Sequence, residues 1–131
     1  MKNKILLLRI SYWLGAILDF LTIIPMLNAK VGAAMFGIAN FNPGNDYRYA
    51  MGVGASLMLG WTFLLIWADR KPLERKGVLI LTICPVMLGL IASGTYAVIS
   101  NLVSINYMLP VLIFQIFIIT FFAYSYFRNS H

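Results

Sequence analysis

Four long apolar stretches, joined by short polar connections, make up most of the chain. They cover residues 5–27, 47–68, 78–100 and 109–127. Each stretch is close to the roughly 20 residues that a helix needs to cross a hydrocarbon layer about 30 Å thick. The pattern therefore predicts an all-α integral membrane protein. We expect a four-helix bundle with up-down-up-down connectivity, forming one transmembrane domain over residues 1–131.

The connections between these stretches differ in character. The second connection reads DRKPLERKG and is a compact charged turn punctuated by Pro72 and Gly77. The first connection contains an apolar segment, residues 29–41, which is too short to cross the membrane and too apolar for a solvated loop. We expect this segment to lie in the interface or to re-enter the membrane. It is either a plain interfacial helix or a lid over an outer cavity.

The composition supports lipid as the main solvent of the chain. Hydrophobic residues make up 61% of the sequence and charged residues 11%, and the mean hydropathy is +0.85. Such a chain is too apolar to hide its hydrophobic groups in one soluble core. The net charge of +6 comes from basic residues beside the spans, which favours lipids over nucleic acid as partners. We expect anionic headgroups at Arg70, Lys71, Arg75 and Lys76.

The basic residues are distributed unevenly between the two sides of the predicted bundle. Eight lie on the side that carries both termini and the second connection, whereas only Lys30 and Arg48 lie on the other side. Positive charge accumulates in cytoplasmic segments of membrane proteins. We therefore expect a cell-membrane protein whose N- and C-termini are both cytoplasmic.

Small residues recur at four-residue intervals and predict where the helices pack. Helices in lipid associate by close backbone approach at such residues. The candidate packing positions, by span, are Ser11 and Gly15, Gly52 and Gly60, and Gly89 and Ser93. An antiparallel pairing of the first two spans would place Asp19 level with Gly52 and Ser56. In the third span Pro85 lies deep enough to bend the helix, because it removes a backbone hydrogen bond.

Asp19 is the one acidic residue in the middle of a predicted span. An Asp at the centre of a bilayer costs about 2.5 to 3.5 kcal/mol on insertion scales, so it must be paired, hydrated or protonated. Other polar side chains are predicted at a similar depth in the outer leaflet or at its mouth. They are Arg48, Tyr49 and Ser56 in the second span, Thr95 and Tyr96 in the third, and Gln115 in the fourth.

Two interpretations of this polar layer compete. In one, Asp19 hydrogen-bonds to a neighbour or pairs with Arg48, and only fixes the helix packing of a structural or accessory membrane subunit. In the other, the layer lines a wet pocket in which Asp19 binds a small cation, a proton or an amphiphile, as in a binding or transport module. The six side chains above are then the other candidate ligand-binding residues.

The sequence offers little material for catalysis. Haem and metal sites in a membrane need His or clustered Cys, and the spans contain only Cys84. Two carboxylates that share a site and a Ser–His or Cys–His pair are also missing from the spans. We therefore expect neither an enzyme nor a bound cofactor. Besides lipids, a second copy of the chain is a candidate partner, which would make a homo-oligomer.

The stretch YWLGAILD, residues 12–19, and the four-span architecture resemble the small multidrug resistance transporters. Those proteins have a similar length and work as dimers around a carboxylate in the first helix. The resemblance covers about a dozen residues, the acid here is Asp rather than Glu, and the other spans carry no motif of that family. The strong charge bias also differs from the weak bias of those transporters. The resemblance is therefore an analogy in architecture and in the position of one acid, and not membership of that family.

Overall fold

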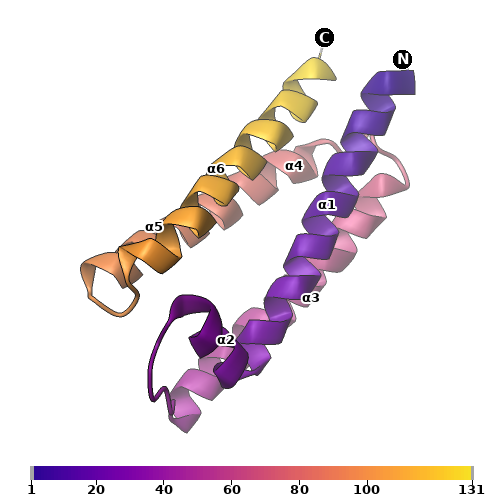
Figure 1. The fold of residues 1–131 in the computed structure, drawn as a ribbon. Coiled ribbons are helices and arrows are strands. Elements are labelled where there is room, and N and C mark those ends of the chain that lie inside the picture. The colour runs from indigo at the N-terminus through magenta and orange to yellow at the C-terminus, as the bar shows by residue number, and fades with distance from the viewer. Residues whose placement is uncertain (1, 131) are drawn as a thin grey trace.

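The computed structural model describes residues 2–130, and every regular element in that range is a helix (Figure 1). The elements are α1 (Lys2–Leu27), α2 (Ala29–Phe36), α3 (Asn45–Asp69), α4 (Gly77–Leu81), the π-helical segment η1 (Thr82–Met87), α5 (Leu88–Ile99) and α6 (Ile105–Arg128). Among the described residues, four helical stretches are long and apolar enough to cross a membrane: α1, α3, the α4–η1–α5 unit and α6. The predicted all-α, four-span architecture is confirmed.

The third span is interrupted at Pro85, as its position predicted. Proline removes a backbone hydrogen bond and clashes with the preceding turn, and it disfavours helical backbone in the residue before it. Cys84 accordingly has φ −130° and ψ 115°, an extended conformation inside η1. The span is therefore built from two helical pieces, α4 and α5, which meet at this kink.

The four spans form two antiparallel hairpins. Helix α1 packs most extensively against α3, and α6 packs along α4, η1 and α5. Both termini lie at one end of the molecule (Figure 1), which we call the terminal end; the opposite end, which carries α2, is the α2 end. The hairpins meet through contacts of α1 with α6 and of α3 with α4.

The hydrophobic core lies toward the terminal end. Leu8 and Tyr12 of α1, Leu65 of α3, Leu79 of α4 and Phe122 of α6 belong to one buried cluster. Helix α5, in contrast, contains no buried residue. The bundle is thus closely packed where the termini lie and opens toward the α2 end.

The register of α1 against α3 differs from the predicted one. An ion pair joins Arg9 to Asp69, and a Cβ at Gly15 would lie 3.0 Å from Leu65 Cδ1. Nearer the α2 end, a Cβ at Gly54 would lie 2.7 Å from Met26 Cε. These three pairs fix how far the two helices are shifted along each other.

Interpolation between these pairs places Asp19 level with Trp61 rather than with Gly52 or Ser56. The shift from Gly52 amounts to about 13 Å at 1.5 Å per residue. The prediction was wrong because it assumed that both helices end at the same membrane plane. Instead, the first two turns of α3, residues 45–52, extend past the end of α1.

The predicted packing residues divide into two groups. Ser11 and Gly15 are buried, as expected. A Cβ at Gly52, Gly60 or Gly89 would meet nothing within 4 Å, and Ser93 is exposed. The close approach expected at these last four positions is therefore not formed within this chain. The close contact of α1 with α3 and α6 is formed at Gly15 instead, where the missing side chain leaves room for Leu65 and Phe122.

Helix α2 occupies the apolar part of the first connection. Asn28 caps its start by accepting hydrogen bonds from the backbone N–H groups of Lys30 and Val31. Gly37 ends it with φ +66°, a left-handed conformation that glycine adopts readily. Gly37 lies against the ring of Tyr107, near the start of α6. Helix α2 thus touches both α1 and α6 and bridges the two hairpins at the α2 end.

Candidate functional site

Asp19 lies on the face of α1 that points into the bundle. Leu8, Tyr12, Gly15 and Asp19 follow one another at intervals of four, three and four residues, which places them on one side of a helix. The first three are buried. Asp19 itself is partly buried, and its Oδ2 atom is shielded from the surface. The side chain therefore points inward and not toward lipid.

Gln115 occupies the matching place on α6. It precedes Phe122 by seven residues, or two helical turns, and so shares the face of α6 that Phe122 presents to Gly15. Its Oε1 atom is buried and has no hydrogen-bond partner within the described part of the chain. Two helices of the bundle thus each direct one buried oxygen inward.

The two side chains lie at a similar depth in the bundle. The contact between Gly15 and the Phe122 ring provides a common reference point on the antiparallel helices. From there Asp19 is about 6 Å farther toward the α2 end, and Gln115 about 10 Å, at 1.5 Å per residue. They differ by less than one helical turn. The predicted depth of Gln115 relative to Asp19 agrees with this placement.

The Asp19 carboxyl group has no partner among the described residues. No hydrogen bond or ion pair reaches it, and Oδ2 is buried without any donor. The residues of α3 at the level of Asp19 provide no donor for its carboxyl group, because the Trp61 indole N–H donates to Thr82 Oγ1 at 2.9 Å. The Thr62 hydroxyl donates to the Met58 carbonyl instead. The hydrogen bond or ion pair expected to fix the packing through Asp19 is therefore absent.

The other candidate residues of α3 lie nearer the α2 end than Asp19 does. Arg48 and Tyr49 are exposed, and they lie in the part of α3 that extends past α1. Arg48 is thirteen residues from the level of Asp19, or about 20 Å along the helix. Ser56 is exposed and donates its hydroxyl hydrogen bond to the Gly52 carbonyl. The structure thus forms none of the contacts that were expected between these residues and Asp19.

The candidate residues of the third span lie apart from Asp19 as well. Thr95 donates to the Ile91 carbonyl of its own helix at 2.9 Å, and the Tyr96 side chain is exposed. Their helix, α5, packs against η1 and α6. Of the six partners predicted for Asp19, only Gln115 combines a matching depth with a buried, unpaired oxygen. Of the predicted polar layer, Asp19 and Gln115 are therefore the two side chains that remain as candidate site residues.

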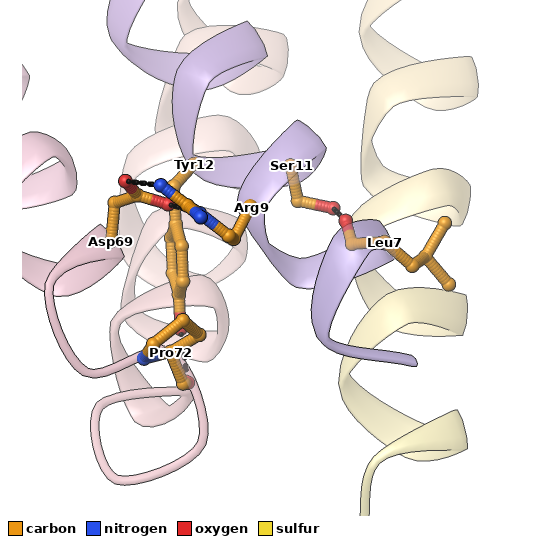
Figure 2. Close-up of polar contacts among 6 residues, drawn as sticks. All are labelled: Leu7, Arg9, Ser11, Tyr12, Asp69 and Pro72. Carbon is orange, nitrogen blue, oxygen red and sulfur yellow. Dashed lines mark hydrogen bonds and ion pairs between the residues drawn. The ribbon is translucent and has the colours of Figure 1, made fainter. Parts of the chain in front are cut away.

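A second polar cluster, at the terminal end, was not predicted. Figure 2 shows the Arg9 guanidinium facing the Asp69 carboxylate, with Tyr12 pointing toward Pro72. Arg9 Nε and Nη2 donate to the two carboxylate oxygens at 2.9 and 3.1 Å. The Tyr12 hydroxyl donates to the Pro72 carbonyl at 2.8 Å. These contacts fasten α1 to the end of α3 and to the charged turn.

Neither Arg9 nor Asp69 was predicted as part of a site, because a charge close to a membrane interface is ordinarily satisfied by headgroups or water. The useful signal was an opposite charge close to the same interface on the adjacent span. Arginine and aspartate side chains placed in this way can reach each other and form a guanidinium–carboxylate contact with two hydrogen bonds.

Three of the four predicted headgroup-binding cations have contacts within the chain. Lys71 pairs with Glu74 at 3.0 Å. Arg75 lies over the Trp67 ring and donates to the Trp67 carbonyl. Lys76 donates to the Asn129 carbonyl and to Ser130. The Arg70 side chain makes no hydrogen bond or ion pair with the part of the chain that the structure describes. Lipid binding by these four residues stays a prediction.

The chemistry available at Asp19 and Gln115 is that of two oxygen acceptors. A carboxylate and an amide carbonyl are hard ligands suited to a proton or a hard cation. Within residues 2–130, no cluster of three or more His, Cys, Asp or Glu residues occurs. The single carboxylate therefore supplies one negative charge, which balances one proton or one monovalent cation.

Comparison with known proteins returned no match, whether to a family model, to a curated protein or to a solved structure. The multi-pass membrane architecture and the geometry around Asp19 are accordingly the basis of the functional conclusion.

Proposed function

We propose that this protein is a membrane module that binds a small monovalent cation or a proton. We further propose that it transports this ion across the membrane. Asp19 supplies the charge and Gln115 a second oxygen ligand. The site lies between α1 and α6, in the half of the bilayer nearer the α2 end. By the distribution of basic residues this end faces away from the cytoplasm.

The observation that carries the proposal is that two buried acceptor oxygens, one on α1 and one on α6 at a similar depth, have no donor among the described residues. An ionised carboxylate in such surroundings has a high free energy unless it is protonated or binds a cation. Buried polar atoms without partners are uncommon in folded proteins, and each one needs an explanation. A proton or cation that comes and goes would satisfy both oxygens while bound.

The alternative is a structural or accessory subunit in which Asp19 only orders the helices. That role needs a donor on a neighbouring helix, since an acid stabilises packing by accepting hydrogen bonds or by pairing with a cation. Asp19 accepts no hydrogen bond from the described residues. The contacts that do order α1 against α3 are those of Arg9 and Tyr12.

Proton release on cation binding tests the proposal directly. The purified protein in weakly buffered detergent solution is titrated with NaCl or KCl, and a pH indicator reports the protons released. We expect release from the wild type that saturates at no more than one proton per chain. The Asp19→Asn variant should release none. Gln115→Leu should weaken the cation affinity on the order of tenfold, the effect of losing about 1.4 kcal/mol of ligand interaction.

Asp46→Asn is the matched control, because Asp46 is an exposed acid at the start of α3. It should behave like the wild type. Circular dichroism and size-exclusion chromatography establish that each variant is folded. Saturable release that persists unchanged in folded Asp19→Asn would disprove the binding site, and absence of release from the wild type would disprove binding of sodium or potassium.

Transport is tested separately in proteoliposomes that contain a pH-sensitive dye. A sodium or potassium gradient should drive proton movement through the wild type and the Asp46→Asn variant, and none through Asp19→Asn. If the protein binds the cation but no proton flux is seen, the protein is a binding module and the proposal of transport is rejected.

A further inference from the structure

An apolar groove runs along the outside of the bundle between α1 and α3. Trp13, Ile17 and Phe20 line one wall, and Leu59, Phe63 and Ile66 line the other. Its volume is about 300 Å³. The one hydroxyl group at its floor, that of Thr62, donates to a backbone carbonyl of its own helix. The groove therefore presents hydrocarbon surface alone.

The lining of the groove suits a flexible chain better than a helix. Helix pairs in lipid pack through small residues that let two backbones approach closely, whereas the walls of this groove carry the aromatic side chains of Trp13, Phe20 and Phe63. A lipid acyl chain is the occupant that suits this lining.

Two arginines lie at the terminal end of the groove. Arg9 precedes the groove residue Trp13 by one turn of α1, and Arg70 follows the groove residue Ile66 by one turn of α3. The Arg9–Asp69 ion pair shows that both positions lie at the same level. This end therefore brings together the mouth of an apolar groove and a group of charged side chains.

The charges at this mouth favour an anion. Asp69 neutralises one of the two arginines, so the group retains a net positive charge. Arg9 uses Nε and Nη2 for Asp69, and its side chain is 55% exposed, which leaves Nη1 available. The Arg70 guanidinium group has no partner among the described residues, and the residue is exposed. A phosphate group could accept hydrogen bonds from both guanidinium groups.

We infer that the groove between α1 and α3 is a binding site for an anionic phospholipid, whose acyl chain fills the groove and whose phosphate contacts Arg9 and Arg70. The site is independent of the proposed function, because Asp19 lies on a different face of α1 from Trp13 and Ile17. It extends the headgroup contacts expected from the sequence, which included Arg70 but involved no groove and no phosphate shared between Arg9 and Arg70.

Native mass spectrometry of the protein released from detergent micelles tests this site. The purified chain is titrated with dioleoyl phosphatidylglycerol or, in parallel, dioleoyl phosphatidylcholine. We expect tighter binding of phosphatidylglycerol. Arg70→Gln should reduce that preference about fivefold, the usual effect of one basic residue near an anionic lipid surface. Arg128→Gln, on the other hairpin, is the control and should leave it unchanged.

Filling the groove tests the acyl-chain part of the proposal. Ile17→Trp places a large side chain in the groove, and Ile24→Trp is its control. Ile24 is on the same helix and similarly exposed, 50% against 53%, but does not line the groove. Ile17→Trp should reduce binding of phosphatidylglycerol at least fivefold, and Ile24→Trp should not.

Three results would overturn the proposal. One is equal affinity for the two headgroups in the wild type. Another is equal lipid binding by folded Ile17→Trp and Ile24→Trp. The third is a monomer–dimer equilibrium that Ile17→Trp alters while lipid binding stays the same, since the groove would then receive a second copy of the chain.

Discussion

At the scale of the residue, Asp19 and Arg9 show two ways in which a span accommodates a charge. Arg9 is near the membrane interface, and it is neutralised by the two oxygens of Asp69. Asp19 is about 12 Å from the end of its helix and has no hydrogen-bond or ion-pair partner among residues 2–130. The first arrangement stabilises the pairing of α1 with α3. The second leaves a site that a proton or cation would complete.

Replacing Asp19 by leucine should stabilise the protein. A buried acceptor without a donor costs about 1 to 3 kcal/mol, and a leucine would remove that cost from the face that α1 shares with Leu8 and Tyr12. We expect the free energy of unfolding in mixed micelles to rise by about that amount. A fall of similar size would instead support the packing role, because it would mean that the wild-type acid makes a stabilising contact.

The residue scale also shows what the sequence can predict. The inward direction of Asp19 follows from its depth, since hydrocarbon is a poor solvent for an acid. Its lack of a partner does not follow, because donors such as the Trp61 indole and the Thr62 hydroxyl lie at its level and only the folded chain shows that they bond elsewhere.

At the scale of the element, the pairing of α1 with α3 depends on a notch at Gly15. Leu65 of α3 and Phe122 of α6 both fill the space where a side chain would begin. Gly60 belongs to a more regular small-residue pattern, yet a Cβ added there would meet nothing within 4 Å among the described residues. Spacing predicted that both glycines pack, but apolar helices carry few features that fix their register. The sequence therefore identified the right pair of helices and aligned them incorrectly.

Valine substitutions at Gly15 and Gly60 should have different effects on the free energy of unfolding. At Gly15 the added atoms would press against Leu65 and Phe122, which are almost completely buried, and overpacking of this kind costs about 1 to 3 kcal/mol. Gly60→Val is the matched control and should change the stability of the monomer little. Unfolding in mixed micelles measures both. Equal effects of the two substitutions would show that the observed register is wrong.

At the scale of the whole molecule, the bundle is tight at the terminal end and open toward the α2 end. The buried cluster, the Arg9–Asp69 pair and the contacts of Lys76 and Asn129 with neighbouring segments all lie near the termini. At the other end the hairpins are bridged by α2, which has no buried residue. Asp19 and Gln115 lie between these two regions. A ligand would therefore approach them from the α2 end.

The direction of that approach depends on how the protein is oriented in the membrane. Eight of its ten basic residues belong to the side with the termini, which favours cytoplasmic termini. In a bacterial host, a green fluorescent protein fused after residue 131 should fluoresce, and alkaline phosphatase fused there should be inactive. Alkaline phosphatase inserted in the connection between α2 and α3 should be active. The reverse pattern would place the open end of the bundle in the cytoplasm.

The most direct test of the central claim observes the Asp19 carboxyl group itself. Infrared difference spectra of the protein in lipid, recorded on exchange of protons for sodium or potassium, show the carbonyl band of a protonated carboxylic acid and the bands of its carboxylate. The account predicts a loss of the carbonyl band with a matching gain of carboxylate bands, present in the wild type and in Asp46→Asn and absent from Asp19→Asn. A difference spectrum that is the same with and without the acid at position 19 would contradict it.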